Sequence, residues 1–225
     1  MREVEIGPDI RVNAAPGSKL VLNAGSGPYA RTRLHPVFHN QSVWTEVRLD
    51  IDEAVKPDIV ASIANLDPID PETMDAIWCS HNLEHLHTHE INTALSEFRR
   101  VLKPDGFALI TLPDLEEIAR LVIDGRLEEV AYHSPAGPIT ALDMIFGHSA
   151  SIRVGRHYMA HHTGFTVETL GRRLAAAEFA EVLVTKGKGY DIWALALMPR
   201  ADKDLLADEF FGSEIDFFSD DLEEV

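Results

Sequence analysis

The sequence predicts an α/β fold built on a mostly parallel sheet. Short apolar runs and helical patterns alternate along the chain, which is the arrangement that βαβ units produce. The clearest apolar run, residues 20–22, stops at Asn23 and passes into two glycines, Gly25 and Gly27. A buried strand that ends in such a turn lets a ligand approach the backbone closely. We therefore expect the functional site at the carboxyl end of this strand.

Seven segments have the apolar pattern of strands. Residues 46–50 alternate apolar and polar side chains, whereas residues 107–112 are apolar enough for a strand buried on both faces. The last two segments flank Gly187 and Gly189, which indicates an antiparallel hairpin. The predicted strands are residues 19–23, 46–50, 58–62, 74–80, 107–112, 181–186 and 190–198.

Helical patterns occupy much of the chain between these strands. In residues 83–102 apolar side chains recur at helical spacing, and the Lys-Pro-Asp-Gly sequence at 103–106 should end that helix in a turn. Residues 114–127 also have a helical pattern, and residues 134–138 are typical of a loop. We expect helices on both faces of the sheet.

Three further stretches carry weaker or irregular signals. Thr166 is the expected N-cap of a helix that ends near residue 177, with an incomplete capping box because Thr169 stands where Glu or Gln is usual. The first helix, around residues 28–40, contains Pro36 and is poorly patterned. The segment between the second and third strands is too short for the usual crossover helix.

Composition limits the classes of protein to consider. The chain has 225 residues and a net charge of -17, and such an acidic surface repels nucleic acid and anionic lipid headgroups. No apolar stretch approaches the ~20 residues that span a bilayer, and the N-terminus lacks the apolar stretch of a signal peptide. Cys79 is the single cysteine, so no internal disulfide can form. We expect a cytoplasmic protein that binds neither nucleic acid nor membranes.

The chain divides into a domain of residues 1–200 and an acidic tail of residues 201–225. Ten acidic residues and one lysine fall within residues 202–225, together with Phe210, Phe211, Phe217 and Phe218. This pattern fits either an amphipathic element that docks on a partner or a sister subunit, which allows a homodimer, or a disordered solubilising tail. The sequence leaves both alternatives open.

The glycine turn is compatible with more than one adenosine cofactor. Residues 25–30, GSGPYA, satisfy the G-x-G-x-x-A dinucleotide fingerprint, and Asp50 at the end of the second strand could accept hydrogen bonds from ribose hydroxyls. However, a pyrophosphate needs free backbone N–H groups, and Pro28 has none. A cofactor without phosphates would lose less, although the pattern by itself still admits NAD.

Two longer motifs resemble a known family. MDAIWCSHNLEHL at 74–86 and EFRRVLKPDGFALITLPD at 97–114 resemble class I S-adenosylmethionine-dependent methyltransferases, in particular small-molecule methyltransferases of the ubiquinone-biosynthesis type. The resemblance covers residues 19–114. It implies a Rossmann-like, mostly parallel seven-stranded sheet with helices on both faces, and S-adenosyl-L-methionine as the cofactor. It also implies a transferase that acts on a small-molecule acceptor.

The resemblance implies a cofactor site along the carboxyl ends of the first four strands. Asn23, Gly25 and Gly27 would face the methionine part, and Asp50 would hold the ribose hydroxyls. The other implied positions are those beside the adenine, Ile51, Ser62, Ile63 and Ala64, and those that border both cofactor and acceptor, Ser80 and His81.

Two of these positions depart from the family pattern. Asn23 and Ser62 stand where the family often has acids. A non-catalytic relative that works through its acidic tail is therefore one alternative function. The glycine fingerprint keeps a second alternative, an NAD(P)-dependent oxidoreductase.

Two residues are candidates for a catalytic role. His81 is the candidate general base, because an ordinary imidazole titrates near neutral pH, and Asp114 is the second candidate. Residues 81–85 also spell H-x-x-E-H, an inverted zinc-protease motif in which His81 and His85 could hold a metal. Because the methyltransferase resemblance accounts for the same residues, we assign no metal ligand.

Residues 113–165 are the expected acceptor-side insertion or lid. A second histidine-rich stretch, His157, Tyr158, Met159, His161 and His162, lies near its end. Such a lid suits an aromatic or anionic acceptor, and Arg153 and Arg156 would favour an anion. The alternative is a surface loop whose histidines form ordinary hydrogen bonds.

Overall fold

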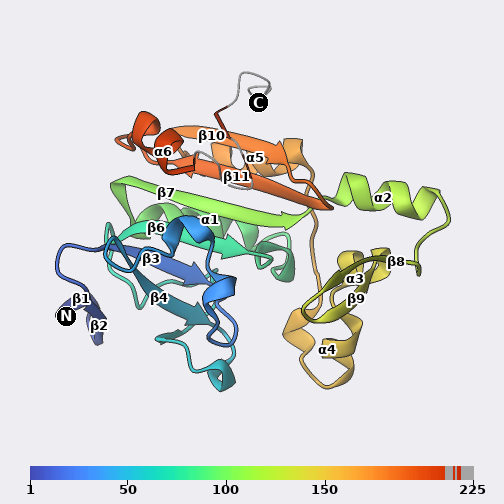
Figure 1. Cartoon of the computed structure of the whole chain (residues 1–225), viewed down its shortest axis with the longest axis horizontal. Helices are drawn as coiled ribbons and strands as arrows, with labels where there is room; N and C mark the ends of the chain where they lie inside the picture. Colours follow the sequence, from blue (N-terminus) through green and yellow to red (C-terminus); the bar gives the residue numbers. More distant parts are fainter. Residues whose placement is uncertain (211–214, 216, 219–225) are drawn as a thin grey trace.

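The computed structural model describes residues 1–210, 215, 217 and 218, and a sheet of seven strands forms its centre (Figure 1). In spatial order these strands are β10, β11, β7, β6, β3, β4 and β5. Their bounds are β3 Lys19–Ala24, β4 Trp44–Asp50, β5 Ile59–Val60, β6 Met74–Ser80, β7 Leu102–Pro113, β10 Glu181–Lys186 and β11 Asp191–Leu197.

The strand directions confirm the predicted fold class. β3 pairs in parallel with β4 and β6, β4 pairs in parallel with β5, and β6 pairs in parallel with β7. β11 runs antiparallel to both of its neighbours, β7 and β10. The β10–β11 pair is the predicted C-terminal hairpin. The carboxyl ends of β3, β4, β6 and β7 therefore lie along one edge of the sheet, where ligands bind in open α/β folds.

Successive residues of the central strands enter two different cores, as the period of two requires. Leu20 and Leu22 belong to one hydrophobic cluster, whereas Val21 belongs to the other. In the same way Ile77 and Trp78 lie on opposite faces. Both faces of the sheet are therefore covered, which explains the nearly continuous apolar strands of the sequence.

Different kinds of element cover the two faces. Helices α1 Ile91–Val101 and α5 Val167–Ala176 pack on the first face. On the second face lie Leu34 and Phe38, from the region of two short 3-10 turns, η1 Arg31–Arg33 and η2 Pro36–Phe38. No α-helix forms in residues 28–40. Pro36 instead begins the second turn, a position where its missing N–H costs nothing.

The beginning of the acidic tail completes the second face. Helix α6, Lys203–Phe210, buries Leu206 and Phe210 against the sheet, and Ile215 and Phe217 are buried in the same cluster. This described part of the tail docks on its own domain. Residues 211–214, 216 and 219–225, with Phe211 among them, lie outside the described residues.

A separate group of elements lies beyond the carboxyl edge of the sheet (Figure 1). Its small core contains Ile118, Leu121, Ile139 and Met144. We call residues 113–165, which form this group, the lid; that they cover an acceptor stays a prediction. Its elements are α2 Leu115–Ile123, β8 Val130–Ser134, β9 Gly137–Thr140, α3 Ala141–Phe146, α4 Ser149–Arg153 and η5 His157–Met159.

The helix predicted over residues 83–102 is shorter than expected. A 3-10 turn, η4 Leu83–His85, replaces its first part, and α1 begins only at Ile91. The prediction failed because the backbone of Glu84 bonds outside a helix: its carbonyl accepts hydrogen bonds from the N–H groups of His162 and Thr163. Residues 103–106 belong to β7 rather than to a separate turn, because Leu102 already pairs with Met74.

Four smaller expectations also differ from the structure. The capping box of α5 is complete, because the Thr169 hydroxyl accepts the Thr166 N–H at 2.8 Å in place of a Glu or Gln oxygen. The loop predicted at 134–138 is the turn of the β8–β9 hairpin. β5 has two residues, and the 3-10 turn η3 Glu53–Val55 forms the short crossover before it. A hairpin of β1 Arg2–Gly7 and β2 Ile10–Ala14 was not predicted.

Candidate functional site

The glycine turn after β3 is fixed to the end of β4. The N–H groups of Gly25 and Ser26 both donate to the Leu49 carbonyl at 2.9 Å. The Gly27 N–H donates to Asp50 Oδ2 at 2.7 Å. Gly25 has a φ of 79° and Gly27 a φ of 60°, so both adopt the left-handed region that favours glycine.

Neither glycine has room for a larger side chain. A Cβ at Gly25 would lie 1.3 Å from Asn82 Nδ2, and a Cβ at Gly27 would lie 2.8 Å from Arg33 Nη1. The turn is therefore a backbone-lined cradle, over which Asn82 and Arg33 lie. That a ligand approaches the backbone here stays a prediction, because these two side chains lie against the glycines.

The residues expected at the ribose and methionine ends lie beside this cradle. Asp50 accepts from Gly27 N–H through one oxygen and from Asp52 N–H through the other at 2.9 Å. Each carboxylate oxygen can accept a second bond, so Asp50 retains capacity for two hydroxyls. Asn23 is buried and donates to Glu46 Oε1 at 2.7 Å, which places an acid next to the position where the family often has one.

The positions expected beside the adenine differ in exposure. Ile51 is 59% exposed and follows Asp50, so its side chain is free to contact a ligand. Ile63 is 4% exposed and packs in the main core, so its side chain is not free to contact an adenine. The hydroxyl of Ser62 accepts the Ala64 N–H at 3.2 Å and shapes the loop after β5.

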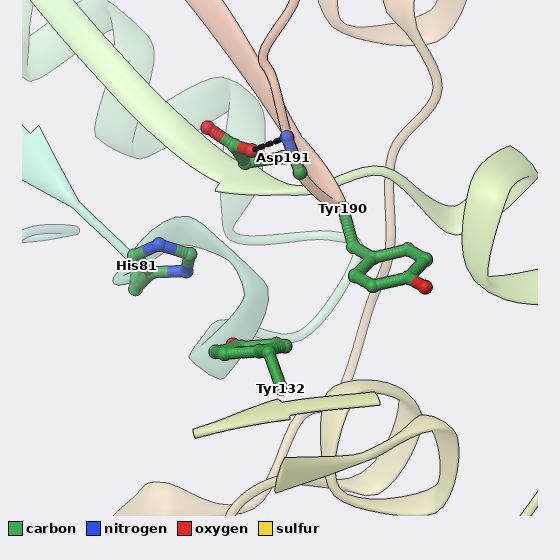
Figure 2. Close-up of a pocket in the computed structure, with 5 residues that line it drawn as sticks. His81, Tyr132, Tyr190 and Asp191 are labelled. Carbon is green, nitrogen blue, oxygen red and sulfur yellow. Dashed lines mark hydrogen bonds between the residues drawn. The ribbon is translucent and has the colours of Figure 1, made fainter. Parts of the chain in front are cut away.

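His81 lines a cavity of about 260 Å³ at the carboxyl edge. It directly follows Ser80, the last residue of β6, and has a φ of 49°. Figure 2 shows the rings of His81, Tyr132 and Tyr190 around a common space. The other lining residues, Gly189 and Asp191, come from the hairpin turn and the start of β11.

A buried carboxylate contacts the His81 ring. Glu84 is 1% exposed, and its Oε1 lies 3.5 Å from His81 Nδ1. Burial by itself would lower the pKa of His81, but the carboxylate of Glu84 beside the ring outweighs this effect, so the pKa is raised. In the same pair, burial would raise the pKa of Glu84, yet the surrounding imidazoles lower it.

Asp114 occupies a different position from His81. Its side chain is fully buried, and it caps α2 by accepting the Glu116 N–H at 2.9 Å. Burial raises its pKa. Asp114 is not among the residues that line the His81 cavity. The structure thus gives this side chain a helix-capping role and does not bring it together with His81.

Histidines of the stretch 81–89 contact histidines of the stretch 157–162. His85 lies against His161 of the lid, with ring centroids 4.8 Å apart, and both are near Glu84. His162 stacks on His87, at 4.1 Å between centroids. Arg153 and Arg156 are exposed and do not line the His81 cavity.

Several residues of the candidate site were not predicted from the sequence. Tyr190 and Asp191 follow the glycines of the predicted hairpin, so their place at the carboxyl edge could have been inferred from the strand order. Glu84 and Asn82 lie within residues 81–85, whose H-x-x-E-H pattern draws attention to the two histidines as candidate metal ligands. Tyr132 carries no local signal, because it reaches the cavity through the tertiary placement of the β8–β9 hairpin.

Comparisons with known proteins agree with this geometry. Residues 29–110 match the family model described as a methyltransferase domain. A SAM-dependent methyltransferase from Archaeoglobus fulgidus has 16% identity and a TM-score of 0.53, over 80% of this chain and 86% of that one. An O-methyltransferase family protein from Burkholderia thailandensis has 14% identity and a TM-score of 0.51, over 83% of this chain and 52% of that one.

No curated protein matches the chain. Among the described residues, no helix has both the length and the apolar character needed to cross a membrane.

The family match begins just after the glycine cradle and ends within β7, so it contains β4, β5 and β6. The glycine cradle lies outside the matched residues but at the same sheet edge, and the solved methyltransferases share the fold around it. Residues 29–110 thus match a methyltransferase domain, and the chain shares the fold of solved SAM-dependent methyltransferases.

Proposed function

We propose that this enzyme methylates a small, planar acceptor in the cavity lined by His81, Tyr132 and Tyr190. The observation that carries the proposal is the position of this cavity. It opens at the end of β6, the strand next to β3 and its glycine cradle. A cofactor along the ends of β3 and β4 would thus have the acceptor beside it.

The residues at the cradle fit S-adenosylmethionine. Gly25 and Gly27 form a turn without side chains of its own, and Asp50 can accept ribose hydroxyls. The exposed Ile51 offers an apolar surface to the adenine. Bound there, the cofactor supplies an electrophilic methyl group. The protein's contribution is then to hold the acceptor in line with it.

The lining of the cavity supports an aromatic acceptor. Tyr132 and Tyr190 present aromatic rings whose centroids are 6.3 Å apart and whose planes differ by 23°. Such faces suit a flat, largely apolar ring. Asp191 brings a carboxylate to the lining, and no lysine or arginine is among the lining residues. We therefore favour a neutral acceptor over the anionic acceptor that Arg153 and Arg156 suggested.

His81 is the side chain placed to receive a proton. A phenolic or amine acceptor loses a proton when its oxygen or nitrogen bonds to the methyl carbon, while the sulfur keeps the electron pair of the broken bond. The imidazole lines the cavity, and Glu84 contacts its Nδ1 from the buried side. A base that a third group orients in this way is a common arrangement in catalysis.

Binding and turnover should be measured separately. We expect wild-type protein to bind S-adenosylhomocysteine in calorimetry, and Asp50→Asn to bind it at least tenfold more weakly. With a labelled methyl donor and a panel of phenols, catechols and heteroaromatic amines, wild type should methylate at least one compound. His81→Asn is the variant to use, because asparagine tolerates the left-handed backbone at this position. It should retain cofactor affinity and lose on the order of 100-fold or more in turnover.

Each measurement can contradict a different part of the proposal. A folded wild-type protein that binds no S-adenosylhomocysteine would contradict the proposed cofactor site. Turnover of aliphatic acids alone would contradict the aromatic acceptor. Unchanged turnover in His81→Asn would remove His81 as the proton acceptor.

A further inference from the structure

Three side chains far apart in the sequence converge between the sheet and the lid. Glu84 and His85 belong to η4 after β6, whereas His161 follows η5 in the lid. One ligand atom from each of these residues lies within 4.8 Å of the others. This group is separate from the residues that line the acceptor cavity.

Each of the two imidazoles has a backbone carbonyl beside its Nδ1. His85 Nδ1 lies 3.1 Å from the Ala160 carbonyl, and His161 Nδ1 lies 2.9 Å from the Met144 carbonyl. A carbonyl only accepts hydrogen bonds, so each Nδ1 must carry the proton. The neutral ring then presents an unprotonated Nε2. Metal-binding histidines usually donate their other N–H to a carbonyl or carboxylate in this way.

Glu84 supplies a carboxylate without a hydrogen-bond donor. Its side chain is 1% exposed, and neither oxygen has a hydrogen-bond partner among the described residues. Among the described residues, its ion-pair contact is with the His81 ring, whose Nδ1 is 3.5 Å from Oε1 and which is charged only when protonated. An ionised carboxylate this deeply buried is costly unless a charge compensates it. A dication between Glu84 and the two histidines would provide that charge.

We propose that Glu84, His85 and His161 bind a divalent transition-metal ion, with zinc as the ion that best fits the donors. Two imidazole nitrogens and one carboxylate are a recurrent zinc ligand set that leaves a fourth position for water. The site would fasten the lid to the loop after β6, because His161 and the other two ligands come from opposite sides.

Metal entry requires a small contraction of the group. Bond lengths of about 2.0–2.1 Å in a tetrahedral zinc site place ligand atoms roughly 3.3 Å apart. The present upper separation of 4.8 Å is larger. The lid can supply this movement, since His161 lies in a connecting segment rather than in a strand of the sheet.

A surface group of histidines provides the competing explanation for any metal uptake. His87 stacks on His162 and also lies 5.8 Å from His89, between ring centroids, and His87 and His89 are exposed. Exposed imidazoles of this kind can take up zinc adventitiously. The experiment must therefore compare the two groups directly.

The test uses full-length protein without an affinity tag, stripped with a chelator and titrated with Zn²⁺ against a competing chromophore. We expect one equivalent to bind, and Co²⁺ to give the visible absorption of a four-coordinate site. Glu84→Gln and His161→Gln should each weaken Zn²⁺ binding at least tenfold. The matched control, His87→Gln with His162→Gln, should leave the tight equivalent unchanged.

Hydrogen exchange gives a second measurement that does not depend on turnover. Zn²⁺ should slow amide exchange at residues 84–85 and 160–163 in wild type but not in His161→Gln. His161→Gln alters only the lid side, so it carries the test if Glu84→Gln does not fold. The proposal is overturned if wild type binds no stoichiometric Zn²⁺, or if the surface variant alone loses it.

Discussion

The Tyr158 hydroxyl donates a 2.5 Å hydrogen bond to Asp52 Oδ2, across 106 residues of sequence. Tyr158 belongs to the lid, and Asp52 lies two residues beyond Asp50 on the loop after β4. This contact joins the lid to the loop that we propose holds the ribose and adenine. It is a charge-assisted hydrogen bond at the surface.

Removing that hydroxyl should loosen the lid without unfolding the protein. We expect Tyr158→Phe to weaken S-adenosylhomocysteine binding by about three- to tenfold, the equivalent of roughly one hydrogen bond. Because this hydrogen bond is exposed, the free energy of unfolding should change little. Calorimetry and chemical denaturation measure the two quantities. Tyr29→Phe is the control, because it removes an exposed hydroxyl and keeps the ring near Arg48; an equal loss of affinity there would refute the lid contact.

Gly25→Ala should impair the cradle beyond the effect of backbone strain. The new Cβ meets Asn82 Nδ2 and also suffers a positive φ, which costs about 1–2 kcal/mol for a residue with a Cβ. Gly17 has the same φ of 79° but open space around it, so Gly17→Ala isolates the strain. We expect both variants to lose stability on denaturation, and only Gly25→Ala to lose cofactor affinity, by at least tenfold. Equal affinities in the two variants would argue against the cradle.

His35 should make the protein acid-sensitive. It is 4% exposed among Phe38, Trp78, Trp193 and Phe210, and its Nδ1 accepts the Val37 N–H at 3.3 Å, as a neutral ring does. Burial, with a smaller effect of the His39 charge, lowers its pKa from 6.5 to about 4.

Between these two pH values the unfolded state binds the extra proton. Stability contributed by neutral His35 is therefore present above pH 6.5 and is lost as pH falls towards 4, by up to about 3 kcal/mol. Denaturation of wild type and His35→Phe from pH 7.5 to pH 4.5 should show a difference that grows in favour of the variant at low pH. Parallel pH curves would contradict the assignment.

Phe210 should be essential for stability although it lies in the acidic tail. It is 2% exposed and packs against Phe107 and Phe217, at ring-centroid distances of 6.2 and 5.7 Å. We expect Phe210→Ala to cost about 3–5 kcal/mol, as for other buried phenylalanines. Leu205, on the same helix, is 48% exposed, and Leu205→Ala should change stability by less than about 0.5 kcal/mol. Similar effects of both substitutions would indicate that α6 does not dock.

Part of the candidate site could be predicted from sequence because its residues follow strands directly. Gly25, Asp50 and His81 each come within a few residues of a strand end, and parallel strands bring those ends to one edge. Tyr132 and His161 could not be placed in the same way. Both belong to the lid, whose position depends on contacts with residues distant in the sequence, such as the pairing of the Glu84 carbonyl with the His162 N–H.

The amino-acid sequence by itself determined the sheet. Burial on both faces imposes continuous apolar strands, and glycine at Gly25 and Gly27 permits a turn that other residues resist. Only the tertiary structure decided that α1 begins at Ile91, that Phe210 covers the second face, and that the lid brings His161 to Glu84. These outcomes depend on contacts between distant segments, which leave no periodic trace in the local sequence.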